Sequence, residues 1–262
     1  DKAPTQNLQA YELYLQGRAV WKRRGEQNLL SAIDLYQRAL GLDPGFARAH
    51  AALASAYVVL PGYTKEEGDE EKFRPLAVAS ARQALAIDPN IGEAHAVLAQ
   101  INAQRGNLLD AESGFFFAIS LEPNEPTPHH WYSLLLGQVG RVDAALEQAR
   151  RAQERDPASP VVAANLANMS LMVGDDEQAL RFNQLASDLG LSKKNTGVES
   201  TVAMRRGQWA EARRLILTQE GIPDGLREQA GRYVDAVADP KLAPQVIAQM
   251  RAVDPKVAEQ LD

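Results

Sequence analysis

The chain has 262 residues and a formal net charge of −6, with 34 Asp and Glu against 28 Lys and Arg. Surfaces that bind DNA or RNA are usually basic, so this balance argues against a nucleic-acid partner. The absence of cysteine excludes disulfides and thiol chemistry. No apolar run of about 18 residues occurs, so no transmembrane helix is predicted. The first residue is Asp1 and no signal-like stretch follows it, from which we expect a fragment or processed form of a longer protein.

One short pattern returns four times along the chain. Each copy begins with an alanine, has a second alanine seven residues later and ends with a proline five residues after that. The last two copies are 34 residues apart, a period that is typical of helical repeat arrays. The copies are Ala32–Pro44, Ala77–Pro89, Ala111–Pro123 and Ala145–Pro157.

Each copy is the second helix of a predicted helix–turn–helix unit. In the third unit His95 and Leu98 lie on the first helix, and Gly106 begins the turn. Small residues at the alanine positions let two antiparallel helices approach closely, and the closing proline ends the second helix. The fourth and fifth units follow the same spacing, with turns at Gly140 and Gly174.

The number of units predicted by these positions is seven. Residues 1–9 are expected to form an N-terminal tail, and residues 10–191 five well-formed repeats. The second repeat carries a mostly charged insertion at about 60–75, bounded by prolines, which we expect to be an exposed loop. Residues 192–262 are expected to form two degenerate repeats and a capping helix at Lys256–Leu261, because a terminal unit has to present a polar outer face.

The spacing resembles that of the tetratricopeptide repeat. Its signature is Trp-x2-Leu-Gly-x2-Tyr on a first helix, followed by Ala-x3-Phe and a closing Pro on a second helix. The resemblance implies an all-α fold, a right-handed superhelical solenoid of about seven helix–turn–helix repeats. Such arrays mostly bind other molecules and seldom carry out chemistry.

Two strings are similar to one particular group of bacterial tetratricopeptide domains. They are AYELYLQGRAVWKRRGEQNLLSAIDLYQRALGLDPGFARAHAALASAYVVL, which runs from Ala10 to Leu60, and HHWYSLLLGQVGRVDAALEQARRAQERDP from the fourth repeat. Domains of that group lie C-terminal in multidomain regulators, beside adenylate cyclase catalytic domains or winged-helix DNA-binding domains. The resemblance therefore implies a regulatory or sensory part of a larger bacterial protein.

The histidines and carboxylates do not form a recognisable catalytic or metal site. His50, His95 and His129 occupy the same position of three successive repeats, which indicates that they are packing residues. His130 points about 100° away from His129 on a helix, so the two make a poor metal site. No phosphate-binding glycine loop, nucleophile elbow or zinc spacing occurs in the sequence. We therefore expect no enzyme, no cofactor and no metal.

The candidate binding surface is the concave side of the solenoid, which the resemblance assigns to the first helix of each repeat. Positions one turn apart on these helices give a neutral to slightly basic lining that is rich in amides. Amides bond the backbone of an extended peptide without demanding a sequence, and arginines bind carboxylates. The residues are Tyr11, Tyr14, Arg18, Trp21, Arg48, Gln100, Gln104, His130, Leu134, Gln138, Asn165, Asn168, Met172, Thr201 and Arg205.

One subtype of the family holds a C-terminal carboxylate with Lys, Asn and Arg side chains from three successive repeats. The chain departs from that pattern, because Tyr14 and Arg18, then Ala52, then Glu93 and Val97 stand at the corresponding positions. We therefore do not expect capture of a chaperone tail of that kind.

Three functions remain open. The first is a protein-interaction module that holds a protein or peptide segment in its concave groove. The second is a domain that senses a small molecule on its inner surface. The third is a self-association module that forms a homo-oligomer through its first-helix aromatics or its degenerate C-terminal repeats. None of the three involves nucleic acid or membrane insertion. The compartment stays open, with the cytoplasm favoured over the periplasm.

Overall fold

The computed structural model describes residues 4–64, 66, 68–191, 196–219 and 222–253, and in this part of the chain it contains helices and no strand. Fourteen α-helices of the described residues form seven pairs, which confirms the prediction of an all-α repeat solenoid. There are also two short 3-10 helices, η1 (Leu60–Gly62) in the second pair and η2 (Pro240–Leu242) in the seventh, and each lies between the two α-helices of its pair. The pairs are α1 (Leu8–Lys22) with α2 (Glu26–Leu42), α3 (Ala47–Val59) with α4 (Asp69–Ile87), α5 (Gly92–Gln104) with α6 (Leu108–Leu121), α7 (Pro126–Gln138) with α8 (Val142–Arg155), α9 (Pro160–Met172) with α10 (Asp176–Asp188), α11 (Thr196–Arg205) with α12 (Trp209–Leu217), and α13 (Asp224–Ala238) with α14 (Ala243–Val253).

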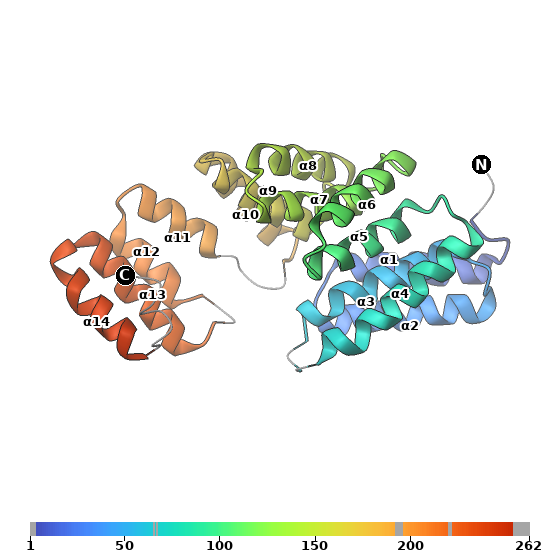
Figure 1. Ribbon diagram of the computed structural model, residues 1–262, viewed down its shortest axis with the longest axis horizontal. Coiled ribbons are helices and arrows are strands. Elements are labelled where there is room, and N and C mark those ends of the chain that lie inside the picture. The colour runs from blue at the N-terminus through green and yellow to red at the C-terminus, as the bar shows by residue number, and fades with distance from the viewer. Residues whose placement is uncertain (1–3, 65, 67, 192–195, 220–221, 254–262) are drawn as a thin grey trace.

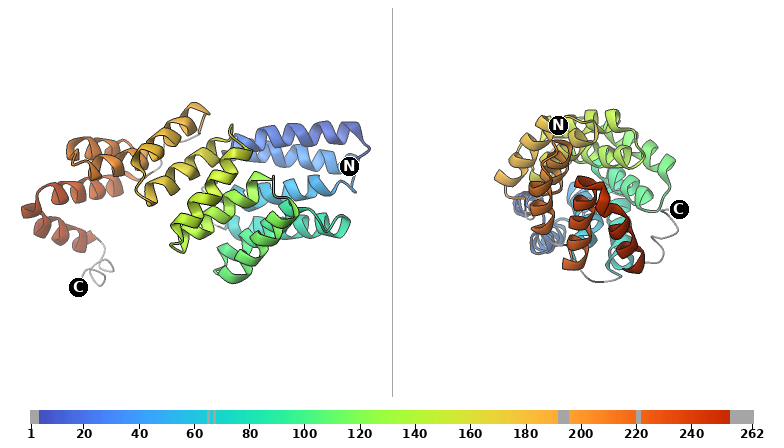
Figure 2. Two further views of the ribbon diagram at one scale, coloured as in Figure 1. Left: turned by 90° about the horizontal axis from the view of Figure 1, so that it is seen from above. Right: turned by 90° about the vertical axis from the view of Figure 1, so that its left-hand side faces the viewer.

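The helix pairs stack into a curved array (Figure 1). Helix α3 contacts α5, α5 contacts α7 and α7 contacts α9, so successive first helices lie next to one another on the inner side of the curve. The second helices form the outer layer, and the array winds into a ring when it is viewed along its long axis (Figure 2). Residues of the inner surface therefore come from first helices.

Glycines at the inter-helix turns adopt a backbone conformation that other residues rarely take. The φ angles of Gly106, Gly140 and Gly174 are +79°, +78° and +85°, in the left-handed region that glycine enters without a steric penalty. Each of these glycines lies two residues before the second helix of its pair. The same backbone turn therefore recurs every 34 residues, with the period of the sequence pattern.

Small residues occupy the closest approaches between helices. Ala77, Ala111 and Ala145, which open the repeated sequence pattern, are completely buried. In the first repeat Gly17 takes the small position of the first helix. A Cβ atom added there would lie 2.4 Å from Cε1 of Tyr36, whose ring is itself fully buried. Dense packing therefore requires small side chains at these positions.

The insertion in the second repeat is more helical than predicted. Helix α4 begins at Asp69 and contains Pro75, whereas we expected an exposed loop through Pro75. Three carboxylates in its first turn suit the positive end of the helix dipole. The ring of Phe73 stacks on Tyr57 of α3, with the two centroids 6.0 Å apart. These contacts extend α4 toward its N-terminus and offset the hydrogen bond that Pro75 does not donate.

The hydrophobic core is continuous over the first repeats and then divides. One cluster of buried side chains extends from Ala10 in α1 to Met169 in α9. A separate small cluster joins α11, α12 and α13. The expected capping helix at Lys256–Leu261 lies outside the described residues.

Candidate binding surface

The inner surface has a half that is closed by ion pairs and a half that is open. The second half of α1 reaches across the array to α5 and to the residues that precede α7 and α9. The side chains that we expected in one continuous groove are therefore divided between two environments.

Arg18 and Glu93 form the centre of the closed half. The Nη1 atom of Arg18 lies 2.8 and 2.9 Å from the two carboxylate oxygens of Glu93. The hydroxyl of Ser55 donates to the same carboxylate at 2.8 Å, and Nη2 of Arg18 lies 3.6 Å from Glu125. Only 5% of the Glu93 side chain is exposed, so these partners rather than water stabilise its charge.

Two further ion pairs extend the closure. The Nη2 atom of Arg48 lies 2.8 Å from Glu122, and Nζ of Lys22 lies 3.0 Å from Asp156. A carboxylate oxygen of Glu122 also accepts a hydrogen bond from the backbone N–H of Glu93, at 3.2 Å. The cations belong to the first two repeats and the carboxylates to the third and fourth. Arg18–Glu93 and Lys22–Asp156 therefore connect the first repeat with the third and fourth, which are not its neighbours in sequence. Arg48–Glu122 connects the second repeat with the third.

Burial and neighbouring charges shift the pKa values of three basic side chains in and beside the closed half. It would by itself lower the pKa of Arg18, but the carboxylate of Glu93 raises that pKa above its ordinary value. Burial lowers the pKa of Arg24 to about 10, and this guanidinium lies 3.5 Å from the ring centroid of Trp21. Burial, and to a smaller extent the charge of Arg24, lowers the pKa of His130 to about 3. The imidazole of His130 is therefore uncharged at neutral pH.

Four residues that we expected to line an open groove are buried: Tyr14, Trp21, His130 and Asn165. The expectation of exposure is wrong for these four, because the superhelix turns tightly enough for first helices to cover one another. The amide of Asn165 donates to the hydroxyl of Ser133 at 3.0 Å, across the contact between α9 and α7. These side chains lie in the core and at contacts between repeats, and Trp21, His130 and Asn165 each keep one buried polar atom without a hydrogen-bond partner among the described residues.

Six of the predicted lining residues form the open half, which we call the amide ladder. They occupy two positions four residues apart on each of α5, α7 and α9, and each position recurs every 34 residues. All of them are exposed except the half-buried Gln100. The ladder contains no charged residue, and two apolar side chains lie among its amides. Its members are Gln100, Gln104, Leu134, Gln138, Asn168 and Met172.

The remaining predicted residues lie at the two ends of the inner surface. Tyr11 is half-buried and stacks on a neighbouring tyrosine. Thr201 donates a hydrogen bond within its own helix. Arg205 forms an ion pair with Asp176 and donates to the carbonyl of Leu171 at 3.0 Å. Arg205 therefore joins the fifth and sixth repeats.

Comparison with known proteins gives matches at the level of structure. No family model and no curated protein sequence matches the chain. Among solved structures, PilF of Pseudomonas aeruginosa is similar, with 18% identity, a TM-score of 0.50 and coverage of 94% of this chain and 97% of PilF. PilW, a type IV pilus biogenesis factor, has 18% identity, a TM-score of 0.52 and coverage of 80% of this chain and 91% of PilW. Human IFIT1, solved as a dimer with m7Gppp-AAAA, has 17% identity and a TM-score of 0.57 over 86% of this chain and 53% of IFIT1.

The helix pairs, their 34-residue period and these structural neighbours decide the fold. The chain has the tetratricopeptide repeat fold. At identities below 20%, these structures establish the architecture of this chain. They do not establish that this chain binds the same molecules as its structural neighbours. Within the described residues, each helix is too short or too polar to cross a bilayer.

Three equivalent histidines connect successive tetratricopeptide repeats. The Nε2 atoms of His50, His95 and His129 lie 3.0, 2.9 and 3.1 Å from the carbonyl oxygen of the proline six residues earlier. A carbonyl oxygen only accepts, so each Nε2 carries a proton. Each proline follows the second helix of the preceding repeat, and each histidine lies on the next first helix. The prediction that these histidines are packing residues is confirmed.

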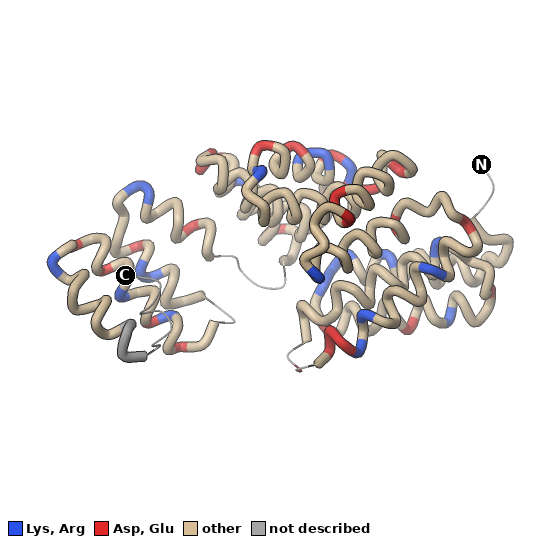
Figure 3. The backbone as a smooth tube through the Cα atoms, viewed as in Figure 1, with Lys and Arg blue, Asp and Glu red and all other residues tan. Residues whose placement is uncertain are grey.

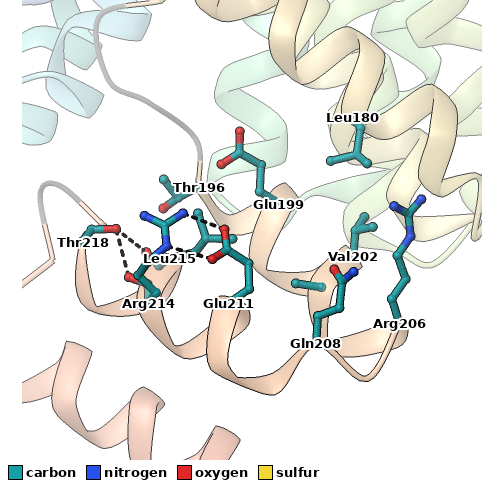
Figure 4. Close-up of a pocket in the computed structure, with 11 residues that line it drawn as sticks. Leu180, Thr196, Glu199, Val202, Arg206, Gln208, Glu211, Arg214, Leu215 and Thr218 are labelled. Carbon is teal, nitrogen blue, oxygen red and sulfur yellow. Dashed lines mark hydrogen bonds and ion pairs between the residues drawn. The ribbon is translucent and has the colours of Figure 1, made fainter.

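A cavity of about 540 Å³ lies where the fifth tetratricopeptide repeat meets the sixth (Figure 4). Arg214 on one side donates to both carboxylate oxygens of Glu211, at 2.8 and 2.6 Å, and Arg206 lies on the opposite side. The buried hydroxyl of Thr196 has no hydrogen-bond partner among the described residues. Sequence analysis did not predict this cavity. The one signal in the sequence is Leu191, which replaces the proline that closes the earlier repeats.

Proposed function

We propose that the chain is a protein-interaction module that binds an extended segment of a partner protein along the amide ladder. The observation that carries this proposal is the exposure of uncharged side chains at equivalent positions of three successive repeats. Exposed side chains contribute little to stability, so folding alone gives no reason for this set.

The chemistry of the ladder suits an extended main chain. A glutamine side chain donates and accepts hydrogen bonds at the same time, so Gln104 and Gln138 are able to bond both N–H and C=O groups of a peptide. Leu134 and Met172 offer apolar contacts beside them, and a methionine side chain adapts to different shapes. We infer a partner segment with uncharged side chains where it contacts the ladder.

The closed half limits how a partner binds. Arg18 and Arg48 are the basic residues that we expected to take a partner's carboxylate, and both are already paired, with Glu93 and Glu122. Recognition by the ladder therefore depends on main-chain contacts along a segment rather than on a terminal carboxylate.

A selected peptide tests this proposal. Peptides from a random displayed library are selected against the chain, and their affinity is then measured by fluorescence anisotropy for the variant with both Gln104→Ala and Gln138→Ala. Two lost hydrogen bonds of about 1 kcal/mol each lower the affinity by roughly tenfold or more. The thermal midpoint stays nearly unchanged, because both side chains are exposed.

The matched control replaces two exposed glutamines of outer helices. Gln27→Ala with Gln83→Ala changes the same chemistry on α2 and α4 and leaves the peptide affinity unaltered. Equal affinities for the ladder variant and this control would show that the ladder is not the binding surface.

We further propose that the module regulates a larger bacterial protein. The support is the similarity of its first and fourth repeats to C-terminal domains of bacterial multidomain regulators. Deleting these 262 residues from the parent protein should change the activity of the attached domain, or its response to a stimulus. An unchanged activity in both conditions would contradict a regulatory role.

The cavity between α10, α11 and α12 supports a second candidate function, the binding of a small polar molecule. Its volume lies within the range of ligand pockets, and the Thr196 hydroxyl and Arg206 guanidinium offer polar contacts. A thermal-shift screen of metabolites should find a compound whose stabilising effect is lost in both Thr196→Val and Arg206→Ala. Stabilisation that survives both substitutions would place that compound elsewhere.

A further inference from the structure

Helix α6 carries an apolar stripe on its outer face. The exposed fractions of Leu109, Phe116 and Phe117 are 80%, 56% and 50%, although all three side chains are large and apolar. Leu109 precedes the two phenylalanines by seven and eight residues, a spacing that places them on one side of a helix. The exposed Ser113 lies between them. We call these four residues the α6 stripe.

Phe117 packs edge-on against the ring of His95 and Phe116 lies against Tyr132, but most of the other repeats fold without apolar residues at these two positions. Counted from the buried alanine at the equivalent position of each second helix, the positions of Phe116 and Phe117 hold mostly polar residues in the other well-formed repeats. A group of exposed large apolar side chains usually marks an interaction surface. The equivalent pairs are Gln37 with Arg38, Arg82 with Gln83, Arg150 with Arg151, and Gln184 with Leu185.

We propose that the α6 stripe binds a second copy of this chain and forms a two-fold symmetric dimer. In this arrangement α6 of one copy packs antiparallel on α6 of the other, with Ser113 at the crossing point. Leu109 lies four residues before Ser113, and Phe116 and Phe117 lie three and four residues after it. Leu109 of each copy therefore meets the phenylalanines of the other, and the small Ser113 allows close approach of the two helices.

The neighbouring outer helix supplies complementary charges. Glu147 of α8 is equivalent to Ser113, so the two-fold axis that passes through Ser113 also passes near Glu147. Asp143 and Arg151 are exposed and lie four residues before and after Glu147, so Asp143 of each copy faces Arg151 of the other. Asp143 and Glu147 precede Arg150 and Arg151 along α8, and Glu154 and Arg155 follow. Figure 3 shows both kinds of charge on this helix.

This charge pattern makes α8 complementary to a second copy of itself, which favours a second copy as the partner. The acidic and basic residues of α8 complement each other only when α8 is paired antiparallel with itself. Arg151 lies 2.9 Å from Glu147 of the same copy, so in the dimer one guanidinium contacts both this Glu147 and Asp143 of the other copy. The apolar stripe and its charged neighbour thus share one symmetry axis.

The expected dimer is weak. A fully buried phenylalanine covers about 150–250 Å², but only 50–80% of each stripe side chain is exposed and so free to be covered, and the six apolar side chains of two stripes therefore contribute roughly 600 Å². The edges of α8 bring the contact toward the lower limit of specific interfaces, about 1,200 Å². A contact of this size makes the dimer population dependent on protein concentration. The stripe lies on the outer layer, so the amide ladder stays accessible in the dimer.

Sedimentation equilibrium over a wide concentration range tests the proposal. The mass of the wild-type chain should rise from one chain toward two, whereas Leu109→Arg should remain a monomer throughout. The matched control is Leu30→Arg, because Leu30 stands at the equivalent position of α2 and is also exposed, by 46%. This control should dimerise like the wild type. A wild-type chain that stays monomeric, or a Leu109→Arg variant that dimerises normally, overturns the proposal.

A charge exchange tests the orientation of the two copies. Asp143→Arg alone and Arg151→Asp alone each bring like charges together and should weaken the dimer by about tenfold. The double variant restores opposite charges and should recover the wild-type dissociation constant. Additive weakening in the double variant would contradict the antiparallel arrangement.

Discussion

The side chains of Arg18 and Glu93 meet at 2.8 Å inside the superhelix, although 75 residues separate them in sequence. The resemblance to the carboxylate-binding tetratricopeptide subtype implies that both stand at positions where that subtype binds a partner's carboxylate. Here the carboxylate that contacts the arginine belongs to the chain itself. The closed half is therefore filled from within, and this leaves the amide ladder as the open part of the inner surface.

Removing one partner of the Arg18–Glu93 pair should lower the free energy of unfolding more than removing both partners. Glu93→Gln leaves a buried guanidinium without its main counter-charge and should lower the free energy of unfolding by about 3–5 kcal/mol. The double variant with Arg18→Met and Glu93→Gln removes the unpaired charge and should recover much of that loss. Urea denaturation of both variants measures the difference. A double variant as unstable as Glu93→Gln would contradict this account of the pair.

His130 should make stability depend on pH. Its pKa in the folded chain is lowered to about 3, so between pH 7 and pH 5 the unfolded chain binds a proton that the folded chain does not. This contribution to stability is complete above the ordinary pKa of about 6.5 and is lost as the pH falls toward 3. From pH 7 to pH 5 the unfolding free energy of the wild type should therefore fall by about 2 kcal/mol relative to that of His130→Leu. A difference that stays constant over this range would show that His130 titrates normally.

Two glycines in helices should respond in opposite ways to alanine. Gly17→Ala places a methyl group against the buried ring of Tyr36 and should destabilise the chain by about 1–3 kcal/mol. Gly41 lies in α2 with no neighbouring atom within 4 Å of the added Cβ. Gly41→Ala should stabilise the chain by up to about 1 kcal/mol, because alanine favours the helix. Thermal unfolding of the two variants measures both effects, and a Gly17→Ala variant at least as stable as the wild type would contradict the packing role of Gly17.

The equivalent histidines should contribute different amounts to the free energy of unfolding, because they are buried to different extents. His129 is 1% exposed, and its ring contacts the carbonyl of Pro123 and the amide of Gln148. His129→Ala should therefore cost about 2–4 kcal/mol, from a lost hydrogen bond and an unfilled space. His50→Ala removes one hydrogen bond from a half-buried site and should cost about 1 kcal/mol. Calorimetric unfolding compares the two, and equal costs would indicate that the proline contact alone sets their contribution.

The repeat pattern was sufficient to predict the local structure. Gly106 and Gly140 mark turns because the backbone there enters the left-handed region, and Ala111 is small because two helices touch there. The start of α4 was predicted incorrectly, since the stacking of Phe73 on Tyr57 joins residues of different helices. Such contacts leave no period in the sequence.

The sequence by itself determined the all-α repeat architecture, the turns and the positions of the amide ladder, because these follow from a period that each unit repeats locally. Only the tertiary structure decided which inner residues are accessible. The burial of Trp21 and His130 and the pairing of Arg18 with Glu93 depend on how tightly the superhelix turns. That curvature is the sum of small rotations at every joint between repeats, so no single segment of the sequence specifies it.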